Sequence, residues 1–245
     1  MKIDIMTRFP EMCEAVLGES IIGRARKAGK VEIACHNIRD FSGNKHNKVD
    51  DTPYGGGMGM VMSAAPIYNC FMSLYDSETE AKPHLVYMTP KGPTFTQKKA
   101  IELSKYDRVV FLCGHYEGVD QRVIDAIVDE EISVGDYVLT GGELPALTVA
   151  DAVCRMLPGV LADDICFTEE SHFAGLLEYP QYTKPETWNG MQVPEVLLSG
   201  HHANIAKWRR ERAIEETYRR RPEMLGEAEL SKKEKIFLDD LKKGE

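Results

Sequence analysis

The chain has 245 residues, 43% hydrophobic and 28% charged, which is enough for one large globular domain or two ordinary ones. Its longest uninterrupted aliphatic or aromatic run, 109–113, is far shorter than the roughly 20 residues that span a bilayer. The net charge of −9, taken as an average, argues against a nucleic-acid partner. Asp4 and Arg8 stand where a secretory signal would be apolar, so we expect a cytoplasmic protein without a membrane segment.

The cysteines and histidines give no sign of a disulfide framework or a structural metal site. The six cysteines are at least twelve residues apart, and no histidine pair has the spacing of zinc ligands. We therefore expect reduced, mostly buried thiols.

Hydrophobic periodicity predicts strands that alternate with helices over the first two thirds of the chain. The predicted strands are 2–7, 31–38, 84–89, 108–113 and the segment EEISVG at 130–135. The predicted helices are 11–28, 63–75 with Ser63 as its cap, 96–105, 119–128 and 142–157. This order is typical of an α/β fold with a mainly parallel sheet covered on both faces.

The pattern changes at Pro158. Residues 158–200 lack sustained periodicity and contain several prolines, as a linker would, whereas the chain from His201 onward reads as helical. Ser231 and Glu234 have the spacing of a capping box at the start of a last helix. We therefore predict an α/β domain over 1–160, a linker over 161–172 and a helical domain over 173–245.

The glycine cluster YGGGMGM at 54–60 matches the letters of a dinucleotide-binding fingerprint but not its context. Such a fingerprint follows a buried strand and opens a helix, whereas this cluster follows the polar segment NKVDDTP. The chain also has no P-loop motif. A tightly turning loop, or one that clamps a substrate, fits the cluster better.

Three glycine-bearing loops follow predicted strands: 89–93, 114–120 and 133–145. Ligands of open parallel sheets bind outside the carboxyl ends of the strands, so these loops would converge on one pocket. Glu117, Asp120 and Asp136 would give that pocket a negative lining, which favours a cationic ligand. The alternative is that the three segments are ordinary turns.

A basic segment, 207–221, contrasts with the acidic remainder of the chain. It holds seven basic and three acidic residues, a net charge of +4, so the other 230 residues carry −13. Trp208 and Tyr218 lie among the cations and offer flat faces for bases. The segment fits an RNA-contacting surface, and a solvated helix face is the alternative.

Five segments together resemble the bacterial tRNA (guanine-N1)-methyltransferase family of the SPOUT class. They are FPEM (9–12), VDDTPYGGGMGM (49–60), GHYEGVDQR (114–122), SVGDYVLTGGELPA (133–146) and VLLSGHHANIAKWR (196–209). The resemblance implies methylation of guanosine 37 beside the anticodon, with S-adenosylmethionine as cofactor. It also implies a deep trefoil knot at the end of the mainly parallel α/β domain, followed by a small all-α domain.

The resemblance also assigns site residues. The matched cofactor-binding positions lie in the three loops and just before them: Tyr87, Thr89, Gly114, Tyr116, Glu117, Val134, Gly135, Asp136, Tyr137, Val138, Leu139, Gly141, Gly142 and Pro145. The expected tRNA-binding positions are Asp50, Tyr54, Lys207, Arg209, Arg210 and Arg212.

The expected chemistry is alignment of the methyl group with guanine N1 and removal of a proton from that nitrogen. Glu170 stands in the place of the family's aspartate base, with Glu169 and Asp164 as alternatives. Arg155 matches a family arginine that stabilises charge on the base. His115 stands where many members have arginine.

Family members are homodimers that build each active site from both chains, and they need magnesium. Two other functions remain open at the level of sequence. One is a SPOUT methyltransferase that acts on another RNA nucleotide, and the other is a non-catalytic RNA-binding protein that keeps the fold.

Overall fold

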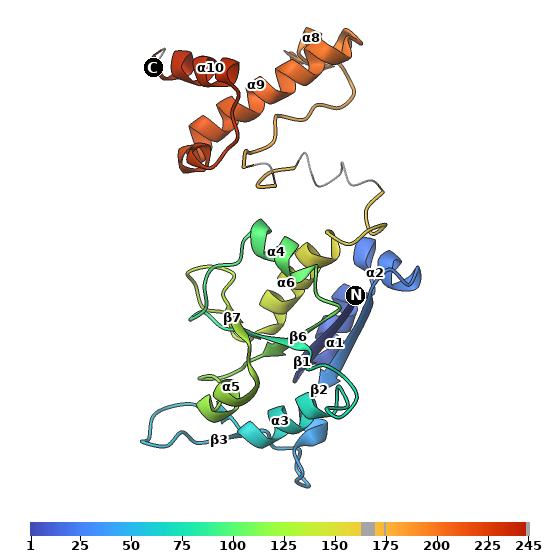
Figure 1. Cartoon of the computed structure of the whole chain (residues 1–245), viewed down its shortest axis with the longest axis vertical. Coiled ribbons are helices and arrows are strands. Elements are labelled where there is room, and N and C mark those ends of the chain that lie inside the picture. Colours follow the sequence, from blue (N-terminus) through green and yellow to red (C-terminus); the bar gives the residue numbers. More distant parts are fainter. Residues whose placement is uncertain (163–169, 174, 244–245) are drawn as a thin grey trace. The chain divides into compact units, whose positions relative to one another are not determined.

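The computed structural model describes residues 1–162, 170–173 and 175–243 (Figure 1). The chain divides into two compact units, Met1–Asp163 and Asp164–Glu245, and each is considered by itself. Most of the predicted linker, 161–172, lies outside the described residues. No helix in the described part of the chain is long and apolar enough to cross a membrane.

The first unit is built on a five-stranded sheet whose neighbouring strands are all parallel. The strand order is β2-β1-β6-β5-β7, so the mainly parallel sheet predicted from the sequence is confirmed. The strands are β1 (Lys2–Thr7), β2 (Glu32–Asn37), β5 (His84–Met88), β6 (Arg108–Cys113) and β7 (Glu130–Ile132).

Helices cover both faces of this sheet (Figure 1). Residues of β6 show why its sequence is continuously apolar: Phe111 joins the core on one face, and Leu112 joins the core on the other. The first face is covered by α1 (Pro10–Leu17), α2 (Ser20–Lys27), α4 (Gln97–Leu103) and α6 (Glu143–Cys154). The second is covered by η1 (Ile38–Phe41), α3 (Ala64–Met72) and α5 (Gln121–Ile127).

The predicted helix over 11–28 is wrong in one respect, because it is two helices. Gly18 ends α1, and Ser20 begins α2 with a positive φ of 53°. The turn is so close to α2 that a Cβ on Gly23 would lie 2.1 Å from the Gly18 carbonyl oxygen. Apolar residues keep helical spacing through the break, so periodicity did not reveal it.

The other predicted helices are present but begin or end a few residues inside the expected bounds. Thr96 and Asp120 cap α4 and α5 through side-chain oxygens that accept backbone N–H bonds. Ser63 holds the N-cap position of α3 but makes no side-chain capping bond there. A short antiparallel pair, β3 (Asp50–Asp51) and β4 (Val61–Met62), encloses the glycine loop 52–60.

The second unit is mainly helical, with a small core around Leu176, Ile214 and Leu238. The predicted capping box is confirmed, since Ser231 N donates to Glu234 Oε2 at 2.7 Å. The unit also contains a two-stranded antiparallel pair, so it is not purely helical as expected. Its elements are β8 (Thr187–Trp188), β9 (Met191–Gln192), α8 (Glu195–Leu198), α9 (His202–Arg220), η2 (Pro222–Gly226) and α10 (Lys232–Lys243).

Candidate active site

A cavity of about 270 Å³ lies at the carboxyl ends of β5, β6 and β7, which are the three strands whose following loops carry glycines. The three loops meet as the sequence predicted. Gly142 N donates to the Gly114 carbonyl at 2.9 Å, and Ser133 N donates to the Pro93 carbonyl at 3.0 Å. The cavity is therefore formed by segments that are spread over residues 87–145 of the chain.

Twelve of the fourteen predicted cofactor residues line this cavity: Tyr87, Thr89, Gly114, Tyr116, Glu117, Val134, Tyr137, Val138, Leu139, Gly141, Gly142 and Pro145. The other two, Gly135 and Asp136, do not line it. Gly135 adopts a φ of 153°, and a Cβ there would lie 2.5 Å from the Tyr137 ring. The backbone bends at this glycine, and the Asp136 side chain is exposed to solvent.

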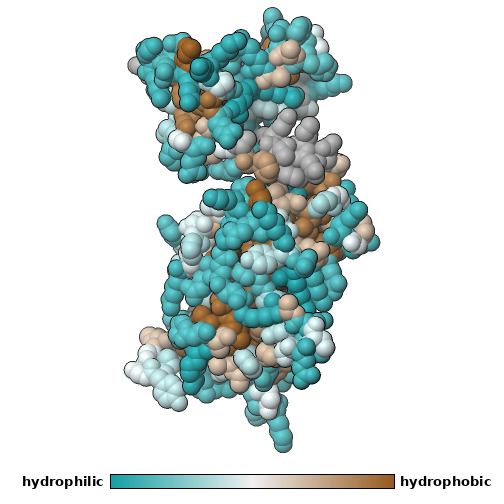
Figure 2. Space-filling model, in the orientation of Figure 1, coloured by the Kyte–Doolittle hydropathy of each residue, from teal (hydrophilic) through white to brown (hydrophobic). Residues whose placement is uncertain are grey.

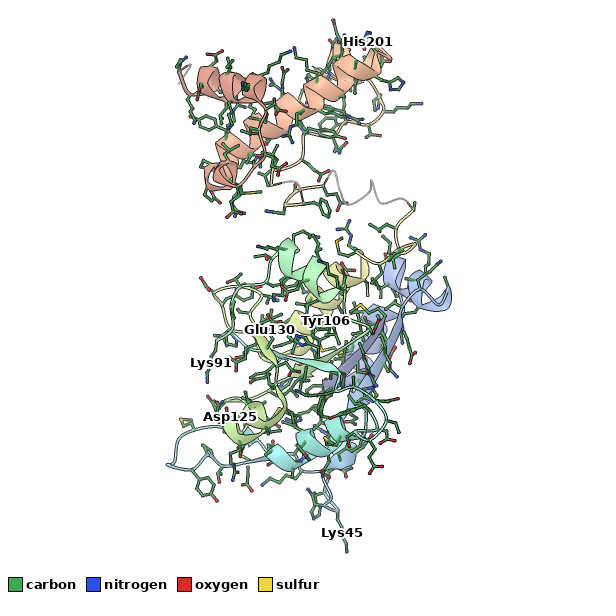
Figure 3. All side chains as sticks on the ribbon, in the orientation of Figure 1. Lys45, Lys91, Tyr106, Asp125, Glu130 and His201 are labelled. Carbon is green, nitrogen blue, oxygen red and sulfur yellow. The ribbon has the colours of Figure 1, made fainter. Side chains whose placement is uncertain are left out.

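Eleven cavity residues were not among the predicted cofactor positions. Most are neighbours in the chain of residues that were predicted, and this closeness could have identified them. Ile124 comes from α5, and no feature of the sequence indicated that it would line the cavity. The eleven are Met88, Pro90, Lys91, His115, Gly118, Val119, Ile124, Glu131, Ile132, Ser133 and Thr140. Figure 3 shows Lys91 pointing away from the body of the first unit.

The charges of the cavity wall differ from those expected. Glu117 lines the cavity as predicted, but the second acid is Glu131. Lys91 also lines the cavity, although its side chain points away from the unit. Asp120 instead caps α5 and pairs with Arg122 at 2.6 Å, and the hydrogen bond from Arg122 lowers the pKa of Asp120. The negative character of the wall therefore comes from two glutamates.

Close contacts at the end of β6 and the start of α6 explain two of the glycines. A Cβ on Gly142 would lie 2.7 Å from Cys113 Cα, and one on Gly114 would lie 2.9 Å from the Tyr87 hydroxyl. These distances are shorter than ordinary van der Waals contact, so the loops need glycine in order to pack. Backbone polar groups can consequently reach the cavity directly.

Tyr87 brings a phenol to the wall of the cavity. Burial and the nearby Glu131 charge raise the pKa of this phenol above its ordinary value of 10. The hydroxyl therefore stays protonated at neutral pH and can donate a hydrogen bond.

The two predicted catalytic residues are not part of this wall. Arg155 follows the last residue of α6, whereas the cavity lies at the start of that helix. Twelve helical residues separate the two ends by about 18 Å. Glu170 belongs to the second unit, and the alternative bases Glu169 and Asp164 lie outside the described residues.

Comparison with known proteins identifies the family. Residues 1–227 match the family model described as tRNA (Guanine-1)-methyltransferase TrmD. The chain belongs to this family.

Three relatives, each named tRNA (guanine-N(1)-)-methyltransferase, match over nearly the full chain. The protein from Ruminiclostridium cellulolyticum is 55% identical over 224 residues, which cover 91% of this chain and 96% of that one. The Alkaliphilus metalliredigens protein is 51% identical over 244 residues, covering 99% of both chains. A Bacillus cereus protein is 50% identical over 244 residues, covering both chains fully. The predicted family and its enzyme class are thus confirmed, and the two alternative functions gain no support.

The expected tRNA-binding residues of the first unit lie beside the glycine loop. Tyr54 is fully exposed, and Gly55, Gly56, Gly57 and Gly59 all have positive φ angles. Asp50 lies in β3, where its carboxylate is 3.9 Å from the buried guanidinium of Arg8. Their role in tRNA binding stays a prediction.

The expected tRNA-binding residues of α9 differ in the contacts that their side chains make within the protein. Lys207 is well exposed, and the guanidinium of Arg209 stacks 4.9 Å from the Tyr179 ring centre. Arg212 pairs with Glu215 on the same helix. Arg210 instead pairs with Glu234 at 2.7 Å and donates to the Glu229 carbonyl, which joins α9 to α10.

Proposed function

We propose that this chain performs its family's reaction on N1 of guanosine 37 in tRNA, with S-adenosylmethionine as methyl donor. The observation that carries the proposal is that twelve predicted residues, from β5 and the three loops, line one cavity, in a chain whose first 227 residues match the family.

The cavity suits S-adenosylmethionine in its chemistry. Apolar side chains such as Ile132, Val134 and Leu139 lie beside backbone groups at Gly114 and Gly141, which is the mixture an adenosine moiety requires. Glu117 and Glu131 can offset a positive charge. When bound, the cofactor supplies a methyl group already activated by its cationic sulfur.

The residues of the chain then have two tasks, orientation and proton removal. The rigid loops around the cavity hold the donor in one geometry, which lowers the entropic part of the barrier. Glu170 accepts the proton from guanine N1, and Arg155 stabilises negative charge as it develops on the base. Glutamate has the acid chemistry of aspartate with one more methylene.

A second copy of the chain is part of the proposal. Arg155 is about 18 Å along α6 from the cavity of its own chain, so it acts in the cavity of a partner. The helices α1 and α6 pack together, and both expose apolar side chains: Met12 and Val16 on α1 and Leu144 on α6. We propose that a partner covers these side chains. The surface visible in Figure 2 is mostly hydrophilic, with smaller hydrophobic patches on both units.

Further features follow from family membership. We propose that the interlocked loops are threaded as a deep trefoil knot and that the protein works in the cytoplasm, where tRNA is modified. The resemblance also implies magnesium. Among the described residues no three His, Cys, Asp or Glu side chains gather as metal ligands, so we name none.

The experiment is methyl transfer to tRNA transcripts that carry G or A at position 37. We expect methylation of the G transcript alone, and equal activity on both would refute the proposal. Glu170→Gln should slow the chemical step far more than it weakens cofactor binding, whereas Glu170→Asp should retain much activity. A Glu170→Gln enzyme that turns over like the wild type would place the base elsewhere.

The shared site has its own test. A Glu170→Gln chain and a Glu117→Gln chain, each inactive alone, should recover activity when mixed, since one site of the mixed dimer is intact. Mixtures that stay inactive although the chains exchange would exclude the shared arrangement.

A further inference from the structure

Two of the three cavity loops and the end of β1 are joined by a hydrogen-bonded chain of side chains. Glu143, the first residue of α6, is buried, and its two carboxylate oxygens have different partners. Thr7 Oγ1 donates to Oε1 at 2.7 Å, and His115 Nε2 contacts Oε2 at 3.0 Å. We call Thr7, Glu143 and His115 the carboxylate clasp.

The direction of each hydrogen bond follows from chemistry. The Thr7 oxygen already accepts the N–H of Phe9 at 2.9 Å, so its own proton is available for Glu143. A carboxylate only accepts, so His115 donates through Nε2. A buried carboxylate is costly without such partners, and its place at a helix N-terminus adds a favourable dipole.

The clasp reaches the cavity through His115 and its neighbours. His115 lines the cavity, and its backbone forms an antiparallel β-bridge with Gly141, which also lines the cavity. A Cβ on Gly141 would lie 2.2 Å from His115 Nε2 and 2.5 Å from Glu143 Oε2, so only glycine leaves room for the pair. Thr7 and Glu143 do not line the cavity.

We propose that the carboxylate clasp is a positioning device that holds loops 114–118 and 133–142 in the cofactor-binding geometry before the cofactor arrives. This inference rests on the proposed function. It assigns His115, Glu143 and Thr7 as positioning residues. Without the clasp the two loops separate more easily, and cofactor binding must supply the free energy that re-forms the wall.

The test compares S-adenosylhomocysteine affinity by calorimetry in three variants. His115→Leu leaves Oε2 unpaired and should weaken binding about 5- to 150-fold, the range expected for an unsatisfied buried acceptor. His115→Gln places an amide donor near the same position and should stay within about threefold of wild type. Thr7→Val removes the distant hydroxyl without touching the cavity and should still weaken binding several-fold.

A matched control separates cofactor positioning from general stability. His36 pairs with the buried Asp4 at 2.7 Å, and neither residue lines the cavity. His36→Leu should therefore lower the melting temperature and leave cofactor affinity unchanged. In turnover, the clasp variants should raise KM for S-adenosylmethionine while kcat and KM for tRNA stay near wild type.

Two results would overturn the clasp. One is wild-type affinity in folded His115→Leu and Thr7→Val proteins. The other is weakened binding in His115→Leu alone, which would make His115 a direct cofactor contact. A wild-type protein that binds S-adenosylhomocysteine but does not methylate guanosine 37 contradicts only the proposed function, so the two failures are distinguishable.

Discussion

Replacing Gly142 by alanine tests the close approach on which the cavity depends. Gly142 has φ −82° and ψ −4°, so alanine fits its backbone without strain, and the effect should be purely steric. The added methyl would lie 2.7 Å from Cys113 Cα and 3.0 Å from Gly114 N, where ordinary contact is about 3.5–4 Å. The end of β6 and the start of α6 must therefore move apart.

Overpacking of this kind costs about 1–3 kcal/mol. In a unit of roughly 160 residues, each kcal/mol lowers the melting temperature by about 2–4 °C. Because Gly142 also lines the cavity, cofactor affinity should fall together with stability.

Gly226 provides the control. A methyl group added to Gly226 would meet no heavy atom within 4 Å, and the φ of this residue is not positive. Gly226→Ala should therefore be neutral or stabilise by about 0.4–1 kcal/mol.

Both tryptophans, Trp188 and Trp208, belong to the second unit, so their fluorescence reports on that unit. Urea unfolding followed by circular dichroism should show the loss in Gly142→Ala. A Gly142→Ala curve that overlays the wild type would refute the steric argument.

Three further predictions concern charge and capping. Burial raises the pKa of Asp4, but hydrogen bonds from His36 and Arg108 outweigh it and hold the pKa below 3.8. The resulting stability is present above about pH 4 and is lost as pH falls through the lowered pKa, so urea midpoints should drop on acidification. In Arg108→Leu the folded and unfolded pKa values of Asp4 lie closer together, so the drop should be smaller. Ser231→Ala should destabilise the second unit by about 1 kcal/mol, measured by tryptophan fluorescence, because the capping box is lost. Arg210→Ala should lower the stability of the same unit, whereas Lys207→Ala should leave that stability unchanged. Lys207→Ala should instead reduce the slope of log tRNA affinity against log salt concentration by about one.

Local patterns predicted the strands of the sheet well. β1 and β6 match their predicted ranges because alternation and continuous apolarity are direct consequences of burial on one or two faces. The break between α1 and α2 was not predictable in this way, because it depends on the contact of Gly23 with the preceding turn. Tertiary contact decided that boundary.

The site was predictable as a set of loops, but its charged wall was predicted less well. Asp120 is the N-cap of the observed helix α5, whereas the helix predicted over 119–128 placed Asp120 inside it, so the capping role was missed. Glu131 lies in a strand, and its approach to the cavity depends on the pairing of β7 with β5. Sequence order alone does not contain that pairing.

The +4 count for 207–221 overstates the charge that is available to a nucleic acid. Arg212 and Arg219 both pair with the buried Glu215 on α9, so displacing them would leave a buried charge unpaired. The more exposed pair of Arg220 with Glu216 is worth only about 0–1 kcal/mol, so a phosphate can displace this glutamate at little cost. Arg210 differs, because its contacts with Glu234 and the Glu229 carbonyl hold α10 in place. The segment therefore combines cations that can bind RNA with one, Arg210, that stabilises the fold. Only substitution of one residue at a time distinguishes these two roles.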